Sequence, residues 1–273
     1  MTLNWVISKV VITSNLSIDR STKPKMQMIV PPQGTGHERL SFPAIISRRE
    51  RAFLTKEKIF QAALRLFARK GFEATSIRDI ALEAEVTSST LYHYMKTKED
   101  LLVAIMQEGL QTLLGNAKEV LAELEAPEQQ LAALVQLHVT SHATDKLTAL
   151  VVDTEFRALT GNTRVEIARL RSEYELLWKR ILTSGLEGGV FTIENTRLAV
   201  LALLQMCTGV AHWYSPDGPS SLEEISLNFS DMALALVQAK RNGQQLTVSD
   251  LDLPEPARFF VKPWLGAAAH EHS

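Results

Sequence analysis

Residues 75–102 read TSIRDIALEAEVTSSTLYHYMKTKEDLL and carry the strongest structural signal in the chain. Their apolar spacing and capping residues predict a helix, a tight turn, a short second helix and the start of a longer one. The second helix would bury Leu91 and expose the polar side chains around it. The major groove of B-form DNA admits one helix, and a helix-turn-helix holds that helix by packing it on its predecessor. This layout favours DNA recognition over catalysis.

Pairs of residues three positions apart predict where the helices begin. Ser76 with Asp79, and Thr97 with Asp100, have the spacing of a capping box, in which each side chain accepts a hydrogen bond from the other residue's backbone. Upstream, Thr55 is the candidate N-cap of the first helix. The boundaries of the helix-turn-helix are therefore mutually consistent.

The rest of the chain also has helical periodicity, so the predicted fold class is all-α. The expected helices are one after Pro127, one at about 149–159, one capped by Thr163 and Glu166 that ends near Gly185, one with an apolar core at 198–204 that continues to Tyr214, and one capped by Ser221 and Glu224. Because the 198–204 segment is apolar on all sides, we expect it to be buried against more than one neighbour.

Composition divides the chain into four parts. Residues 1–47 lack a sustained period and contain several prolines and glycines, which predicts a disordered N-terminal extension or sequence upstream of the native start. Residues 48–100 form the predicted three-helix DNA-binding domain, and residues 101–242 form a larger helical ligand-binding and dimerisation domain. Residues 243–273 are proline-containing and are expected to form an extended tail.

Charge supports this division. The 273-residue chain has a net charge of −2, but residues 48–102 hold 11 Lys/Arg against 8 Asp/Glu, a local excess of +3 on an acidic remainder. Such asymmetry suits a DNA-binding domain joined to a different module. Cys207 is the only cysteine, which excludes an intrachain disulfide, and no stretch has the pattern of a signal peptide or membrane span. We expect a soluble, cytoplasmic protein.

The helix-turn-helix region closely resembles the N-terminal domain of TetR-type transcriptional regulators over about 50 residues. The matching positions are Ile59–Ala63, Phe67, Gly71-Phe72, Thr75–Ala81, Val86-Thr87, Thr90–Tyr92, Tyr94 and Lys98–Leu101. Two positions depart from the family pattern: Glu85 stands where glycine is usual, and Met95 stands where phenylalanine is usual.

The resemblance implies a homodimer that reads a palindromic DNA operator, with one DNA-binding domain on each half-site. It implies base contacts from Ser88, Ser89, Tyr92 and His93, and phosphate contacts from Thr75, Thr90, Tyr94 and Lys98. The alternative for the two tyrosines is that they only pack the small domain. Arg48, Arg49 and Arg51 could form a minor-groove arm, but a solvated charge run is the favoured interpretation.

The C-terminal half resembles the ligand-binding and dimerisation domain of the same family. Residues 213–219, WYSPDGP, are similar to a segment in a branch whose members control fatty-acid, aromatic-acid or steroid breakdown and sense acyl-CoA thioesters. This implies a small apolar or acyl-CoA effector. The alternative is that the segment is only a rigid turn beside the dimer interface.

The last two helices of the family pair with their symmetry mates in a four-helix bundle, an isologous interface. The apolar residues of this region exceed what one small domain easily buries, which independently favours a homodimer. The predicted interface residues are Leu201, Trp213, Phe229, Met232 and Leu236.

Aromatic and thioether side chains at inward positions suit a mostly apolar cavity, although core packing is the alternative for each of them. The candidate ligand-binding residues are Met106, Leu110, His138, Phe156, Arg171, Tyr174, Trp178 and Met206. Arg171 could meet a phosphate or carboxylate, or be solvated along the edge of its helix. His138 and His142 have the i, i+4 spacing of two metal ligands with Asp145 nearby, but no further ligand cluster accompanies them, so no metal is expected.

Other classes of protein are disfavoured. The sequence has no GxSxG elbow, phosphate-binding glycine loop or HExxH motif, so neither an enzyme nor a cofactor is expected. A helical adaptor or structural protein without DNA binding is the remaining alternative, and it predicts a degraded recognition helix, whereas residues 88–94 keep their polar character. The sequence therefore predicts a ligand-responsive DNA-binding regulator, a repressor released by its effector.

Overall fold

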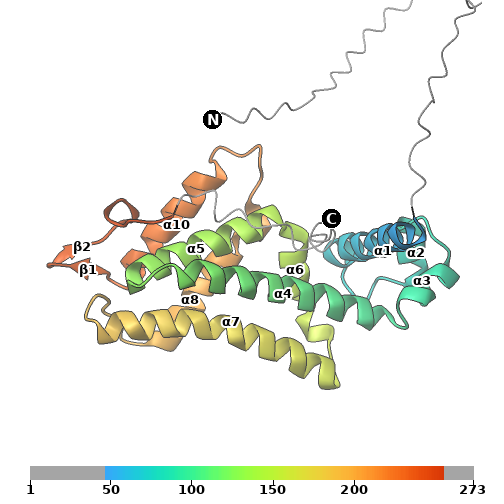
Figure 1. Ribbon diagram of the computed structural model, residues 1–273, viewed down its shortest axis with the longest axis horizontal. Coiled ribbons are helices and arrows are strands. Elements are labelled where there is room, and N and C mark those ends of the chain that lie inside the picture. Colours follow the sequence, from blue (N-terminus) through green and yellow to red (C-terminus); the bar gives the residue numbers. More distant parts are fainter. Residues whose placement is uncertain (1–46, 255–273) are drawn as a thin grey trace, which may run out of the picture. The chain divides into compact units, whose positions relative to one another are not determined.

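The computed structural model describes residues 47–254, and the predicted all-α fold class is confirmed (Figure 1). The expected disordered extension before residue 47 and the end of the expected tail, residues 255–273, lie outside the described residues. Within residues 47–254, no helix combines the length and the apolar character needed to cross a membrane.

The helices form two groups that are continuous along the chain. The first group, which we call the head, consists of α1 (Arg48–Lys70), α2 (Ile77–Glu83) and α3 (Ser88–Tyr94). The second group, which we call the body, consists of α4 (Lys98–Ala122), α5 (Pro127–Thr144), α6 (Lys146–Thr154), the 3-10 helix η1 (Glu155–Ala158), α7 (Gly161–Glu187), α8 (Thr196–Thr208), α9 (Val210–Trp213), α10 (Leu222–Leu236), the two-residue strands β1 (Lys240–Arg241) and β2 (Gln244–Gln245), and the 3-10 helix η2 (Val248–Asp250).

Three helices begin at the predicted capping boxes. Ser76, Thr97 and Ser221 each accept a hydrogen bond from the backbone N–H three residues later, and the acidic residue at that position accepts one from the N–H of the cap. Each box satisfies two backbone donors that a helix start leaves unpaired. These pairs therefore determine where α2, α4 and α10 begin.

Helix α1 begins earlier than expected. Its N-cap is Ser47, which forms a capping box with Glu50, whereas the predicted cap Thr55 lies inside the helix. The Thr55 hydroxyl donates to the carbonyl oxygen of Arg51 at 2.8 Å, a bond that a threonine in mid-helix commonly makes. The arginine cluster at 48–51 is consequently part of a helix and not an arm that precedes one.

Helix α7 also begins before its predicted cap. It starts at Gly161, after Thr160, and Thr163 lies in its first turn. The Thr163 hydroxyl oxygen is 2.7 Å from both the carbonyl oxygen of Thr160 and the carboxylate of Glu99 at the start of α4. The threonine therefore joins two helices instead of capping one.

The end of the described chain differs from the predicted extended tail. Strands β1 and β2 pair antiparallel as a tight hairpin. Leu246, the residue that follows β2, is buried in the core of the body. The apolar 198–204 segment of α8 was expected to be buried against more than one neighbour, and the helix packs on α5, α7 and α10. Leu198 and Leu201 nevertheless remain exposed in the single chain.

Two hydrophobic clusters stabilise these helices. One lies within the body and includes Leu134 of α5 and Trp178 of α7. The other contains residues of both head and body, with Phe67 of α1 in the same cluster as Val151 of α6 and Ile167 of α7. Helix α4 belongs to both, because it runs from the head along α5 and α7 (Figure 1). The head is therefore packed on the body through apolar contacts.

The turn between α2 and α3 adopts the left-handed conformation for which glycine is usual. Glu85 occupies it with a φ of 56°. For an L-residue with a Cβ, this backbone conformation costs about 1 kcal/mol or more of conformational free energy. The departure from the family pattern therefore keeps the geometry of the turn and adds strain to it.

Candidate nucleic-acid interface and ligand pocket

Helix α3 has the features of a recognition helix. Its N-cap Thr87 accepts a hydrogen bond from the Thr90 N–H at 3.1 Å, and Leu91 is fully buried in the head. Ser89 and His93 are exposed, and Tyr92 is 56% exposed although it is aromatic. One buried leucine thus anchors a helix whose other face carries polar and aromatic groups at the surface.

The remaining predicted contacts on α3 are half-buried. Ser88 is half-buried, and the hydroxyl of Thr90 lies 2.9 Å from that of Thr87. Tyr94 is half-buried against the core of the head, and its ring meets the edge of His93 at a centroid distance of 5.7 Å. For Tyr94, the packing alternative and a phosphate contact through its hydroxyl are compatible.

Thr75 does not have the exposure that a phosphate contact requires. Its side chain is buried, with 1% of its surface exposed, and its hydroxyl donates to the carbonyl oxygen of Gly71 at 2.8 Å. The bond stabilises the segment between α1 and α2. The Thr75 hydroxyl is therefore not available to a DNA phosphate.

Lys98 is engaged within the chain. Its Nζ donates to the carbonyl oxygen of Phe72 at 2.6 Å and lies 4.0 Å from the centroid of the Phe72 ring. An ammonium group has three donors, so this bond leaves donors for a second partner. This contact could not be predicted from local spacing, because the two residues are 26 positions apart.

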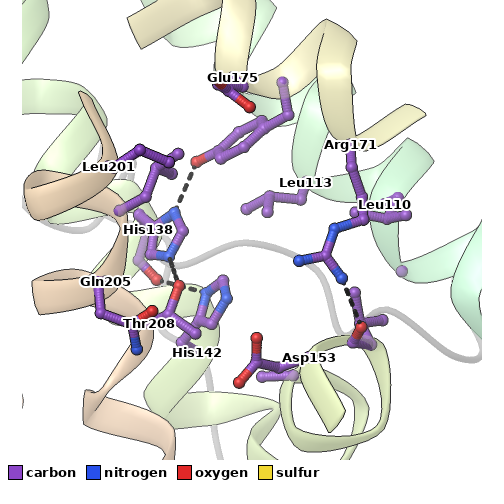
Figure 2. A pocket seen from close by; sticks show the side chains of 15 residues that line it. Leu110, Leu113, His138, His142, Asp153, Arg171, Glu175, Leu201, Gln205 and Thr208 are labelled. Carbon is purple, nitrogen blue, oxygen red and sulfur yellow. Dashed lines mark hydrogen bonds between the residues drawn. The ribbon is translucent and has the colours of Figure 1, made fainter. Parts of the chain in front are cut away.

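The body contains a cavity of about 220 Å³ between α4, α5, α6, α7 and α8 (Figure 2). Its walls are partly apolar and partly polar. The lining residues are Gly109, Leu110, Leu113, His138, His142, Ala149, Val152, Asp153, Arg171, Tyr174, Glu175, Leu201, Leu204, Gln205 and Thr208.

The structure brings together half of the predicted ligand-binding residues. Leu110, His138, Arg171 and Tyr174 line the cavity, whereas the other four candidates do not. Met106 is buried in the cluster that joins head and body, Trp178 is buried in the cluster of the body, Met206 packs against that cluster, and Phe156 packs against the cluster of head and body. The polar lining residues Asp153, Glu175, Gln205 and Thr208 were missed, because a polar residue on an amphipathic helix is ordinarily solvated.

A row of hydrogen bonds fixes one wall of the cavity. His138 Nδ1 lies 2.9 Å from the Tyr174 hydroxyl, and His138 Nε2 lies 3.1 Å from the Thr208 hydroxyl (Figure 2). His142 Nδ1 lies 2.9 Å from the carbonyl oxygen of His138. Since a carbonyl only accepts, Nδ1 of His142 carries its proton, and Nε2 is the acceptor of the neutral ring.

Both imidazoles are neutral at physiological pH. Burial lowers the pKa of His142 to about 4. Burial, followed by the neighbouring His142, lowers the pKa of His138 well below its usual range. The cavity wall therefore offers hydrogen-bonding groups without charge.

The charged residues that line the cavity lie on α6 and α7. Arg171 donates from Nη1 to the carbonyl oxygen of Val152 at 3.0 Å, and its guanidinium lies 5.0 Å from the Phe156 ring centroid. Asp153 and Glu175 also line the space (Figure 2). A guanidinium has five N–H donors, so Arg171 can hold a ligand oxygen in addition to Val152.

The histidine pair is arranged for stacking and hydrogen bonding. Both ring nitrogens of His138 face hydroxyl groups, and its ring stacks on that of His142. Within residues 47–254, no group of three or more His, Cys, Asp or Glu side chains has the geometry to hold a metal ion.

The predicted dimer residues form an exposed apolar set on the last helices of the body. Trp213 and Met232 are more than half exposed in the single chain, and Leu201 and Leu236 are exposed to a smaller degree. Phe229 is half-buried and lies against Trp213, with ring centroids 6.1 Å apart. Leu198 on α8, which was not among the predicted residues, is exposed as well.

Comparison with protein families identifies both parts of the chain. The family model for bacterial regulatory proteins of the tetR family matches residues 59–105. The model for the tetracyclin repressor-like C-terminal domain matches residues 124–237.

Individual proteins agree with these matches. The HTH-type transcriptional repressor KstR2 of Mycolicibacterium smegmatis is 26% identical over 181 residues, which are 66% of this chain and 88% of that protein. A solved tetR-family regulatory protein from Rhodococcus RHA1 is 29% identical, with a TM-score of 0.64 over 68% of this chain and 98% of that one. AibR, solved in complex with isovaleryl coenzyme A and operator DNA, is 24% identical and shares the fold, with a TM-score of 0.61 over 65% of this chain and 97% of that one.

Proposed function

The chain belongs to the TetR family of DNA-binding transcriptional regulators, and from that premise we propose that it represses genes by occupying a palindromic operator as a homodimer. A small effector in the cavity of the body releases it. The repression takes place in the cytoplasm and involves no enzymatic step. KstR2 relatives that bear the name of repressor support the direction of regulation.

The observation that carries this proposal is the surface of α3. Ser89, Tyr92 and His93 are exposed on a short helix that Leu91 anchors, and Tyr94 and Lys98 lie at its end and just beyond. Hydroxyl and imidazole groups can read base edges, while an ammonium can meet a phosphate. An adaptor without DNA binding gives no reason for such a surface.

Dimerisation would give the two heads their spacing. Leu198 and Leu201 of α8, like Met232 and Leu236 of α10, are large apolar side chains that one chain leaves exposed. Two-fold pairing of these helices would bury the set and would set two α3 helices one turn of DNA apart, about 34 Å.

The cavity supports an acyl-CoA thioester as the effector. A volume of about 220 Å³ lies below the range of whole drug-sized ligand sites, so it suits an acyl group whose carrier lies outside. Leu110 and Leu113 would contact the acyl chain of the effector, and Arg171 would hold an oxygen of the thioester or of its CoA carrier. The complex of AibR with isovaleryl coenzyme A supports this class of effector.

The DNA-binding proposal is tested by selecting genomic fragments that the protein retains, followed by gel-mobility titration. We expect Tyr92→Ala to weaken operator binding about tenfold or more, since one specific contact contributes about 1–3 kcal/mol. Lys118→Ala, on the exposed side of α4 in the body, is the control and should bind as the unaltered protein does. Retention of no particular sequence would support the adaptor alternative.

The effector proposal is tested by thermal unfolding with isovaleryl-, octanoyl- and palmitoyl-CoA beside the corresponding free acids. A ligand at about 100 times its Kd stabilises the folded state by about 2.7 kcal/mol, which raises Tm measurably. The thioester that raises Tm should also release the operator. Equal responses to acids and thioesters would exclude a role for the CoA group.

A further inference from the structure

The backbone of Phe72, between α1 and α2, is held by two charged side chains from outside the head. Its N–H donates to Oε2 of Glu155 in η1 at 3.1 Å, and its carbonyl oxygen accepts from Nζ of Lys98 at 2.6 Å. Hydrogen bonds to charged groups are stronger than neutral ones, and the bond from Lys98 is also short. These two bonds therefore fix the position of one short segment of the head.

Glu155 is one of two buried acidic side chains among residues 47–254: it is 7% exposed, and Glu128 is 4% exposed. The other oxygen of Glu155, Oε1, accepts from the Thr154 hydroxyl at 3.2 Å. A carboxylate is rarely buried without a compensating partner, and here the Phe72 N–H is that partner in the head. The contact joins residues 83 positions apart, so it reports the position of the head relative to η1.

The same segment of the body is held from the cavity by Arg171. The guanidinium bonds to the carbonyl oxygen of Val152 and lies over the ring of Phe156, which are residues on either side of Glu155 in sequence. Arg171 and Val152 both line the cavity. A continuous series of contacts thus leads from the cavity through α6 and η1 to Phe72, in the segment between α1 and α2.

We propose that Glu155 is the positioning residue that couples the cavity to the DNA-binding head, and that Arg171 controls it. An anionic or carbonyl oxygen that draws Arg171 away from Val152 and Phe156 loosens the segment 152–156 and weakens the bond from Glu155 to Phe72. The inference rests on the proposed function for its biological meaning. A ligand shifts such an equilibrium only by its difference in affinity for the two states, and Arg171 supplies that difference.

Hydrogen exchange at the Phe72 amide tests the coupling without any ligand, in the full chain. We expect Glu155→Ala to speed this exchange at least tenfold, and Arg171→Ala, which removes a group that does not bond to Phe72, to speed it at least threefold. Arg169→Ala is the matched control, because Arg169 is exposed on the same helix and its ion pair within residues 47–254 is with Glu173, one turn further along that helix. The Leu134 amide in the core of the body should exchange at its original rate in every variant.

Operator binding provides the second readout. Glu155→Ala and Arg171→Ala should each weaken operator binding at least fivefold. The double variant should lose no more operator affinity than the weaker-binding single variant, because both changes break one series of contacts. If Glu155→Ala does not fold, Glu155→Gln keeps an acceptor without the charge and should give an intermediate exchange rate.

Two results would overturn the inference. One is an Arg171→Ala variant in which Phe72 exchanges at the original rate. The other is equal acceleration at Phe72 and Leu134, which would mean general destabilisation. Failure of the unaltered protein to bind any operator would refute the proposed function instead, and the exchange data would still decide whether the cavity and the head are coupled.

Discussion

The imidazole ring of His142 stacks on that of His138, with centroids 3.8 Å apart and 10° between the planes. Two positive charges at that distance would repel strongly in a buried site. The stacked pair therefore cannot hold both charges, and burial, which lowers the pKa of each ring, keeps both neutral near pH 7. This arrangement makes the fold sensitive to acid.

We expect the free energy of unfolding to fall as pH decreases from about 6.5 to about 4. The pKa of His142 is about 4 in the folded state and about 6.5 when unfolded. Between these values the unfolded state binds more protons than the folded state, so lowering the pH stabilises the unfolded state. The loss from His142 alone is about 3 kcal/mol, and it is absent above pH 7. Urea unfolding at a series of pH values measures it. His142→Phe keeps a stacking ring without titration and should flatten the profile; an unchanged slope would exclude His142 as the cause.

Glu85→Gly should stabilise the protein by about 1 kcal/mol. Glycine adopts the φ of 56° at this turn without the strain that a Cβ causes. Glu85→Ala is the control, since it removes the same carboxylate and its exposed ion pair with Lys58 but keeps the Cβ. Chemical denaturation of the three proteins compares them. Equal stability of the glycine and alanine variants would show that the turn is unstrained.

Gly185→Ala should destabilise the protein by about 2–3 kcal/mol. A Cβ at this position of α7 would lie 2.0 Å from Cδ2 of Phe191, a buried ring that packs in the core of the body, so the ring or the helix would have to move. Gly115→Ala in α4 is the matched control, because a Cβ there meets nothing within 4 Å and should stabilise the helix by about 0.5–1 kcal/mol. Opposite shifts in Tm are the expected result, and a stable Gly185→Ala protein would contradict it.

Leu201→Glu should convert the proposed dimer to a monomer at micromolar concentration. The side chain is 44% exposed on α8, and a carboxylate at this position would be desolvated in the proposed interface. Leu82→Glu, at an 82% exposed position of α2, is the control and should leave the molecular mass unchanged. Light scattering distinguishes the two outcomes. A monomeric unaltered protein would refute the dimer itself.

Local signals in the sequence were sufficient where one short motif determines the structure. The capping boxes at Ser76, Thr97 and Ser221 act between residues three apart, so no knowledge of the fold is needed to interpret them. The same chemistry misled at Thr55 and Thr163, because a threonine hydroxyl can also bond a carbonyl within the helix or a side chain of another helix. The sequence does not distinguish these cases.

The cavity could be predicted only in part, for a reason of geometry. Tyr174 and Trp178 are four positions apart on α7 and so share one side of the helix, yet Tyr174 lines the cavity while Trp178 is buried in the core of the body. Which of two neighbours meets a cavity depends on how α5 and α8 pack against α7. Helical spacing identifies the inner side of a helix, but tertiary packing determines what lies opposite.

The hydrophobic cluster that includes Phe67, Val151 and Ile167 bears on how relatives of this protein can be recombined. A head transplanted from another regulator would need matching apolar side chains on α6 and α7, and an acceptor equivalent to Glu155 for its own turn. Chimeras joined within α4 after Thr97 would interrupt that set of contacts, even though the graft leaves the recognition helix intact. Substitutions confined to the exposed residues of α3 leave the shared core unchanged. Operator sequence preference can therefore change while the packing of the head on the body is retained.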